Sequence, residues 1–226
     1  MSELKKKVGA AAAEMVKDGQ RLGLGTGSTV FFFLQRLGER IRDEGLSVTG
    51  IPTSVQTAGQ ARELGIPLIT FEDSGTLDFY VDGADEIDLD LNMIKGGGGA
   101  LLREKVVASA SDRKVIIVDG SKVVERLGLG FDLPVEVVPF GWQPCRERLL
   151  RLGCEPALRK EGEELFVTNN GNYILDCAFA EGIADPAVME ASMNRIPGAV
   201  CNGLFIGLAD EALVGRETGV ESLRRR

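Results

Sequence analysis

Along the first 130 residues, short apolar runs alternate with longer segments in which apolar positions recur at helical spacing. The apolar runs predict strands at residues 22–25, 48–51, 67–69, 77–81 and 115–118. The helical spacing predicts helices over residues 3–17, 54–64 and 100–111, and a further helix that begins near Ser28. Because strands alternate with helices, we expect a parallel sheet that is covered by helices on both faces.

After Gly130 the order of elements changes. Strand patterns occur at residues 134–138, 165–168, 173–176 and 199–206, and helical patterns at residues 143–152 and after Asp185-Pro186. Asn169-Asn170-Gly171-Asn172 is typical of a hairpin turn between two antiparallel strands. We therefore expect an α/β fold, in which a small α+β unit of the split β-α-β kind (residues 131–200) is inserted into a Rossmann-like parallel-sheet domain (residues 1–130 and 201–226).

The composition is that of a soluble globular protein, and it narrows the class of partner. Hydrophobic residues make up 44% and charged residues 27% of the chain, whose net charge is −8. This acidic balance disfavours nucleic acid and anionic membranes as partners, and no apolar stretch approaches the length of a membrane span. The four cysteines are widely spread and form no CxxC pair. That usage is typical of reduced thiols in the cytoplasm, where we expect the protein.

The chain contains no histidine, which limits its chemistry near neutral pH. General acid–base steps must use carboxylates, lysines, cysteines or tyrosines instead. Histidine is also missing as a partner for cysteine in a zinc site. The carboxylates and lysines that follow the predicted strands are therefore the candidate acids and bases.

A glycine-rich turn follows the first predicted strand, in the sequence Gly23-Leu24-Gly25-Thr26-Gly27-Ser28-Thr29. A phosphate at this turn would meet unpaired backbone N–H groups, the positive end of a helix dipole and the hydroxyls of Thr26, Ser28 and Thr29. The turn matches neither the P-loop motif nor the G-x-G-x-x-G motif. From these residues alone, a phosphate site and a plain strand–helix turn capped by Ser28 or Thr29 are equally open.

Acidic side chains crowd the segment after the strand at residues 77–81, which reads Val81-Asp82-Gly83-Ala84-Asp85-Glu86-Ile87-Asp88. Ligand sites of open parallel sheets lie at the carboxyl ends of strands, where Asp82 and Asp85 would stand. A solvated acidic loop is the expectation for Glu86, Asp88 and Asp90. A Mg²⁺ or Mn²⁺ site is a less favoured alternative, because Lys95 would compete with a cation for the same space.

Lys95 precedes four consecutive glycines, Gly96 to Gly99. Such a run costs conformational entropy and packs nothing, so it suits a place where backbone N–H groups approach a ligand, as in an oxyanion or phosphate nest. Glu104 follows at the start of the next predicted helix, where, taken by itself, it is expected to be an ordinary surface acid. Lys122, in Asp119-Gly120-Ser121-Lys122, can reach the same edge of the sheet unless it belongs to a simple turn.

Six segments of the chain resemble the ribose 5-phosphate isomerase A family in sequence and in order. They are GLGTGSTV, VDGADEID, KGGGGALLREK, VDGSK, LPVEVVPFG and TNNGNYILDC. The similarity covers nearly the whole chain, and the long motifs around Asp82 and Lys95 are far more specific than a lone glycine fingerprint. Departures are small: Asn169 stands where an aspartate is common, and Cys201-Asn202 occupies a variable stretch.

The resemblance implies an enzyme that interconverts D-ribose 5-phosphate and D-ribulose 5-phosphate without metal or organic cofactor. It implies that Glu104 is the general base and that Asp82, Asp85 and Lys95 are the other catalytic residues. The implied substrate site consists of Thr26, Gly27, Ser28, Thr29, Asp82, Gly83, Ala84, Asp85, Lys95, Gly96, Gly97, Gly98 and Lys122. A homodimer or a dimer of dimers is implied as well.

The residues themselves are compatible with this chemistry. One carboxylate can take a proton from C2 and return it to C1 through a cis-enediol, if its pKa suits the transfer. Lys95 and the glycine N–H groups can stabilise the oxygens of that intermediate, whereas the roles of Asp82 and Asp85 are not separable. Two other classes stay open: a domain that senses sugar phosphates, which has no need of Glu104, and a CoA-transferase-like enzyme, which uses a glutamate as nucleophile.

Overall fold

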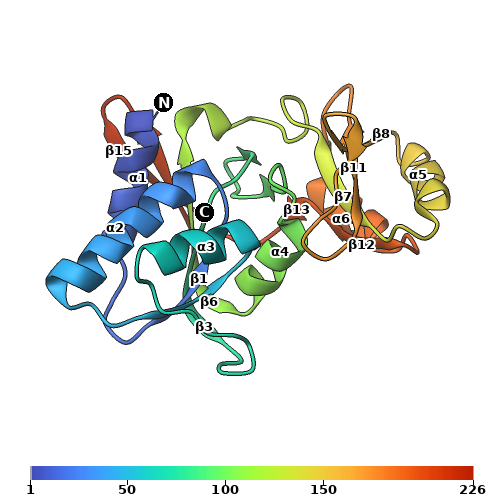
Figure 1. The fold of residues 1–226 in the computed structure, drawn as a ribbon. Helices are drawn as coiled ribbons and strands as arrows, with labels where there is room; N and C mark the ends of the chain where they lie inside the picture. The colour runs from blue at the N-terminus through green and yellow to red at the C-terminus, as the bar shows by residue number, and fades with distance from the viewer. Residues whose placement is uncertain (1, 226) are drawn as a thin grey trace.

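The computed structural model describes residues 2–225, and its largest sheet has six strands (Figure 1). These are β1 (Arg21–Leu24), β2 (Thr49–Pro52), β3 (Leu77–Asp82), β6 (Ser111–Asp119), β14 (Glu211–Arg216) and β15 (Gly219–Arg224). They lie in the order β15-β14-β6-β3-β1-β2, and only β15 is antiparallel to its neighbour. The mostly parallel sheet confirms the predicted α/β fold.

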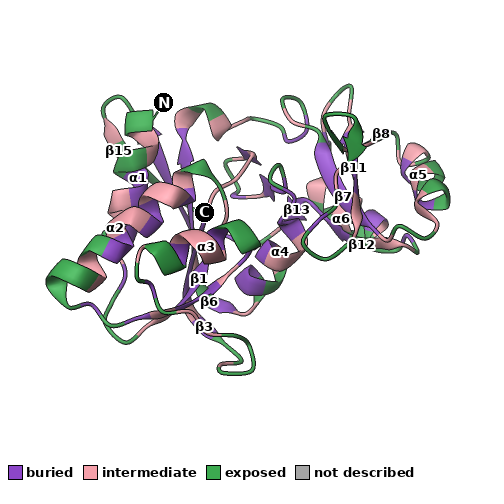
Figure 2. Ribbon diagram, in the orientation of Figure 1, coloured by how far each residue is buried: buried purple, intermediate pink, exposed green. Residues whose placement is uncertain are grey.

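Helices cover both faces of this sheet and leave its central strands buried (Figure 2). The helices are α1 (Ser2–Glu14), α2 (Ser28–Glu44), α3 (Val55–Glu63) and α4 (Leu101–Ser109). Side chains of a strand alternate between its two faces. Phe79 and Val81 of β3 therefore join the core beneath α1 and α2, whereas Tyr80 packs with Val107 of α4. Asp82 continues the alternation of Tyr80 and faces the side of α4.

A second, antiparallel sheet forms the smaller group of strands. It has the order β12-β7-β11-β8, from β7 (Leu133–Val137), β8 (Glu155–Leu158), β11 (Tyr173–Ala178) and β12 (Ala199–Asn202). Its apolar core includes Cys145 of α5 (Trp142–Leu150) and Met193 of α6 (Pro186–Met193). Asp185 caps α6 as predicted, because its side chain accepts a hydrogen bond of 3.0 Å from the Val188 N–H.

Short elements join the two sheets. β4 (Glu86–Ile87), β5 (Met93–Ile94) and β13 (Leu204–Phe205) form a three-stranded sheet, and β9 (Lys160–Glu161) pairs with β10 (Glu164–Leu165). A 3₁₀ turn, η1 (Gly120–Lys122), follows β6. Within residues 2–225, every helix is too short or too polar to cross a membrane.

Three strand predictions were wrong. Residues 67–69 make only a single bridge, between Leu68 and Gly50. The strand at residues 165–168 does not form a hairpin with β11, because β11 pairs instead with β7 and with β8, a strand that the sequence pattern did not reveal. The strand at residues 199–206 breaks at Gly203, whose N–H donates to Pro134 and whose carbonyl accepts from the Lys95 N–H. Gly203 therefore bridges two different sheets.

The expectation of a solvated acidic loop was wrong for Glu86. It is only 3% exposed, and its carboxylate accepts hydrogen bonds of 2.6 and 2.8 Å from the N–H groups of Gly128 and Gly130. A buried carboxylate is tolerated because these two donors replace the water it loses. Glu86 thus anchors the connection between η1 and β7.

The turn at residues 168–172 connects the smaller sheet to the larger group of elements. Asn169 accepts a hydrogen bond of 3.1 Å from the N–H of Val55, the first residue of α3, and Asn170 accepts one of 2.9 Å from Arg103 of α4. The expected domain boundaries stay a prediction, and the second of them falls inside β12. Through these contacts, one turn of the smaller unit binds two helices of the larger unit.

Candidate active site

The carboxyl ends of β1, β3 and β6 meet at a cavity of about 230 Å³. From β1 the chain passes to β2 on one side and then to β3 on the other, so the direction of winding reverses between β1 and β3. Open α/β sheets bind ligands at such a reversal. Glu104 and all the substrate-site residues implied by the sequence line this cavity, with Asp82 as the only exception.

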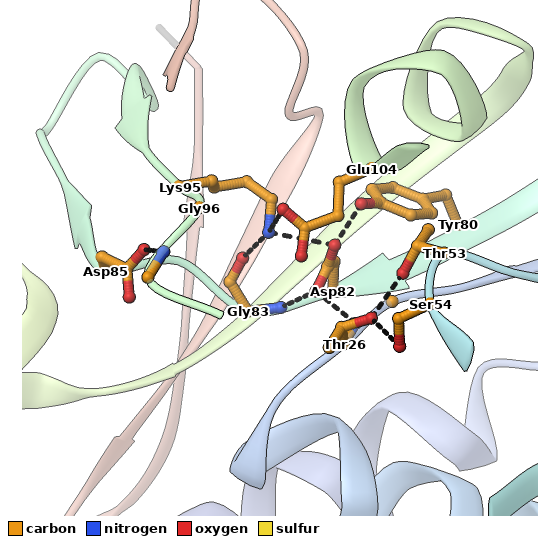
Figure 3. Close-up of polar contacts among 12 residues, drawn as sticks. Thr26, Thr53, Ser54, Tyr80, Asp82, Gly83, Asp85, Lys95, Gly96 and Glu104 are labelled. Atoms are coloured by element: carbon orange, nitrogen blue, oxygen red, sulfur yellow. Dashed lines mark hydrogen bonds and ion pairs between the residues drawn. The ribbon is translucent and has the colours of Figure 1, made fainter. Parts of the chain in front are cut away.

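Lys95, which lines the cavity, lies between two carboxylates (Figure 3). Lys95 Nζ lies 2.9 Å from Asp82 Oδ2 and 3.4 Å from Glu104 Oε2, and it donates a hydrogen bond of 2.6 Å to the Gly83 carbonyl. All three side chains are at most 5% exposed. Glu104 Oε2 has no hydrogen-bond donor among residues 2–225, so only the ion pair compensates its burial.

These three residues come from three elements. Asp82 ends β3, and Glu104 lies in the first turn of α4, on the face of the sheet toward which Asp82 points. Lys95 directly follows β5, and its N–H donates to the Gly203 carbonyl between β12 and β13. The cluster is therefore assembled by the packing of α4 and the three-stranded sheet, not by any local motif.

Burial and neighbouring charges change the pKa values of the cluster. Burial is the main reason why the pKa of Glu104 is raised to about 8; Asp82 and Asp85 raise it further, while Lys95 opposes them. Burial alone would lower the pKa of Lys95, but the charges of Asp82 and Glu104 outweigh it and raise that pKa. Glu104 therefore exchanges its proton near neutral pH while Lys95 keeps its charge, as a proton shuttle requires.

The two aspartates have different surroundings. Asp82 is fully buried and accepts hydrogen bonds from the N–H groups of Thr26 (3.1 Å) and Gly83 (2.7 Å), and from the Tyr80 hydroxyl. Asp85 lines the cavity, where its Oδ2 accepts a hydrogen bond of 2.8 Å from the Gly97 N–H. Only Asp85 of the two is therefore placed to contact a ligand.

The lining of the cavity also includes two further lysines, the carboxylate of Asp119 and the start of α2. Gly27 precedes α2 with a φ of 130°, a conformation that suits glycine, and Ser28 and Thr29 form the first turn of the helix. Lys5 of α1 donates a hydrogen bond of 2.9 Å to Ser28 Oγ, and Lys122 also lines the cavity. A helix N-terminus, hydroxyls and ammonium groups are the kinds of group that bind phosphate in proteins.

The structure changes two expectations for this part of the site. The Thr26 hydroxyl does not face the cavity, because it lies 2.7 to 3.0 Å from the hydroxyls of Thr53, Ser54 and Thr57 (Figure 3). Lys5 was missed, since nothing in a lysine-rich helix start distinguishes one lysine from its neighbours. Only the packing of α1 against α2 brings it to Ser28.

Comparisons with known proteins agree with this geometry. A sequence model of the family "Ribose 5-phosphate isomerase A (phosphoriboisomerase A)" matches residues 49–219. Ribose-5-phosphate isomerase A 1 of Oceanobacillus iheyensis is 51% identical over 96% of both chains, and the Gloeobacter violaceus protein is 52% identical over 97% of this chain and 95% of its own.

Solved structures show the same similarity. The ribose 5-phosphate isomerase of Plasmodium falciparum has a TM-score of 0.96 at 41% identity and covers 100% of both chains. That of Methanocaldococcus jannaschii has a TM-score of 0.94 at 41% identity, with 98% of both chains covered. A D-ribose-5-phosphate isomerase in complex with phospho-erythronic acid has a TM-score of 0.95 at 38% identity, covering 99% of this chain and 98% of its own. This chain therefore belongs to the ribose 5-phosphate isomerase A family.

Proposed function

We propose that this protein interconverts D-ribose 5-phosphate and D-ribulose 5-phosphate and that Glu104 moves the proton between C2 and C1. The observation that carries the proposal is the cavity itself. It is lined by a buried carboxylate of raised pKa beside an ammonium, and also by a helix start with free hydroxyls and two further lysines. A ligand held by its phosphate near Ser28 would direct its opposite end, C1 and C2, toward Glu104.

The reaction follows from these positions. The Glu104 carboxylate takes the proton from C2 of the open-chain aldehyde, and the electron pair of that bond forms the C1–C2 double bond of a cis-enediolate with charge on O1. Lys95 and the N–H groups of the glycine run stabilise this charge. Transfer of the O2 proton to O1 then moves the negative charge to O2. Protonated Glu104 returns its proton to C1 as C2 becomes the ketone carbon.

Different roles follow for the two aspartates. Asp85 lines the cavity and can exchange protons with the substrate oxygens, in ring opening and between O1 and O2. Asp82 does not line the cavity, and its carboxylate holds Lys95 at 2.9 Å. We assign Asp82 to positioning and to charge balance, because a fully buried carboxylate beneath Lys95 keeps that lysine protonated.

The pH dependence of kcat/KM tests the state of Glu104. Only the deprotonated form is a base, so kcat/KM is expected to rise with pH through an apparent pKa well above 4.5, the ordinary value for glutamate. The measurement is kcat/KM for ribose 5-phosphate from acid to mildly alkaline pH. An acid limb that ends near the ordinary glutamate value would contradict the raised pKa.

Ser28→Ala tests the phosphate site. A hydrogen bond to a charged group contributes about 1.5–3 kcal/mol, so KM for ribose 5-phosphate is expected to rise roughly tenfold to a hundredfold. Unphosphorylated ribose provides the control, because its weak reaction does not use this part of the cavity. Equal losses on both substrates would show that Ser28 supports the fold instead.

Removal of divalent metal should leave the activity unchanged. Within residues 2–225 no group of three or more Asp, Glu, Cys or His side chains is arranged to hold a metal ion, and the ammonium of Lys95 lies between the two buried acids. The measurement is the rate after exhaustive dialysis against EDTA. Loss of activity that Mg²⁺ or Mn²⁺ restores would contradict the metal-free mechanism.

The decisive experiment for the function is NMR of ribose 5-phosphate with the protein in D₂O. Formation of ribulose 5-phosphate with deuterium at the exchanged carbon supports an isomerase that uses an enediolate. Binding without conversion would identify a sugar-phosphate sensor, and reaction only with an acyl-CoA would identify a CoA-transferase.

The family resemblance also supports a homodimer or a dimer of dimers, and a cytoplasmic location. Analytical ultracentrifugation of the purified protein tests the first of these. A monomer at micromolar concentration would contradict it. Fractionation of the source cells tests the second.

A further inference from the structure

An arginine of the smaller unit reaches across to the glycine run of the cavity. Arg159, which directly follows β8, donates hydrogen bonds from Nη1 to the carbonyls of Gly96 (2.8 Å) and Gly97 (3.0 Å). Its side chain does not line the cavity of Glu104 and lies behind the glycine run. Arg159 therefore contacts the site only through the backbone of these glycines.

The guanidinium of Arg159 is itself held in place. Its Nε and Nη2 donate to the two carboxylate oxygens of Asp176 on β11, at 2.9 and 2.5 Å, and it lies 5.6 Å from the centre of the Phe166 ring. The side chain is 13% exposed. A planar fork can bind a carboxylate with one edge while its remaining nitrogen bonds carbonyls, whereas a lysine ammonium lacks this geometry.

The two carbonyls that Arg159 holds determine where two N–H groups point. In a planar trans peptide the carbonyl of one residue and the N–H of the next point in opposite directions. The Gly96 carbonyl is joined to the Gly97 N–H, which donates to Asp85 at 2.8 Å on the far side of the loop. The Gly97 carbonyl is joined in the same way to the N–H of Gly98, a residue that lines the cavity.

The backbone of the glycine run is tightly packed at Gly97. A Cβ atom on Gly97 would lie 2.7 Å from Asp85 Oδ1, so the backbone passes directly against that carboxylate. Rotation of the peptide by a few tens of degrees would break the contact with Asp85 and turn the next N–H away from the cavity. The Arg159 guanidinium on the opposite side, which donates to both carbonyls and is itself held in place, opposes that rotation.

We propose that Arg159, held by Asp176, is a positioning residue for the isomerisation: it fixes two peptide groups of the glycine run, so that Asp85 and the Gly98 N–H are aimed at the reacting oxygens. The inference rests on the proposed function of the cavity. It gives the smaller unit a part in the chemistry, because one of its side chains orients the stabilising donors.

Arg159→Met and Arg159→Lys test the proposal. Because misplaced donors cost reaction rate more than they cost ground-state binding, kcat is expected to fall about 10- to 100-fold in both variants while KM changes about threefold or less. Asp176→Asn should lower kcat in the same direction. The double variant Arg159→Met/Asp176→Asn should lose no more than Arg159→Met alone, since the two residues act as one unit.

Arg21 provides the matched control. It forms a similar two-point pair with Asp78, at 3.2 and 3.0 Å, at the amino ends of β1 and β3 and thus at the opposite edge of the sheet from the cavity. Arg21→Met should lower the thermal midpoint and leave kcat at the wild-type level. All rates are compared at a temperature at which every variant is folded by circular dichroism.

Two results would overturn the inference. One is an Arg159→Met variant that keeps the wild-type kcat. The other is a fall in kcat that is equal in the Arg159 and Arg21 variants and follows their loss of thermal stability. Either result leaves the proposed function intact if the wild type converts ribose 5-phosphate and Glu104→Gln does not, whereas an inactive wild type overturns both.

Discussion

Replacement of Glu104 by Gln is expected to lower kcat for ribose 5-phosphate by about 10²–10⁴-fold, the usual contribution of a general base. Glutamine has nearly the same shape but takes up no proton, so KM should move little. Glu211→Gln is the matched control, because Glu211 is also buried but lies at the amino end of β14, at the other edge of the sheet. Near-wild-type kcat in Glu104→Gln would show that this acid is not the base.

The same variant reports the cost of burying the carboxylate. The folded state holds the Glu104 proton up to a pKa of about 8, against 4.5 in the unfolded chain, so it binds more protons between these two values. The free energy of unfolding of the wild type should therefore fall, relative to Glu104→Gln, as pH rises through this window. Urea unfolding of both proteins across that range measures the difference. A constant difference would show that the pKa of Glu104 is not raised.

Lys95→Met is expected to damage both the reaction and the fold. It leaves Asp82 and Glu104 as two buried carboxylates without their shared cation, and loss of one partner from a buried pair costs about 3–5 kcal/mol. Because Lys95 lowers the pKa of Glu104, its removal also raises that pKa further and leaves less of the deprotonated base at neutral pH. With the charge on the oxyanion unpaired as well, kcat should fall at least about 10²–10³-fold.

Lys105→Met is the control for this substitution. The ammonium groups of Lys95 and Lys105 both approach the Phe205 ring, at 5.5 and 4.9 Å, but Lys105 donates to the Leu204 carbonyl and pairs with Glu190 away from the cavity. Its loss should affect unfolding in urea and leave kcat within about threefold of the wild type, as for sites outside the reaction. If the two variants lose kcat equally, Lys95 has no special part in the chemistry.

Local patterns predicted the elements whose signals are local. Strand–helix alternation predicted the parallel sheet, and Asp185-Pro186 predicted the start of α6, because periodicity and capping depend only on near neighbours in sequence. The same applies to the motifs at strand ends: once the strands are parallel, the carboxyl ends of β1, β3 and β6 must meet. The candidate site could therefore be located from the sequence.

Partners that are distant in sequence could not be predicted in this way. Asn169 to Asn172 form a turn, yet β11 pairs with β7 and β8 and not with the residues just before the turn. Glu86 reads as one more acid of an exposed loop, and only the approach of two N–H groups from residues 128 and 130 makes its burial possible. The residues of a strand do not indicate which strand it will pair with. Likewise, the residues around a carboxylate do not indicate which distant N–H groups will donate hydrogen bonds to it.

The sequence by itself determined which residues are available for chemistry: an acid–base set without histidine, a glycine run beside Lys95, and a hydroxyl-rich turn before a helix. Only the tertiary structure decided the surroundings of each one. It buried Asp82 beneath Lys95 and left Asp85 in the cavity, and it brought Lys5 and Arg159 to the site from α1 and from the smaller sheet. The reason is physical: pKa values and hydrogen-bond directions depend on burial and on neighbours in space, which are set by packing between elements.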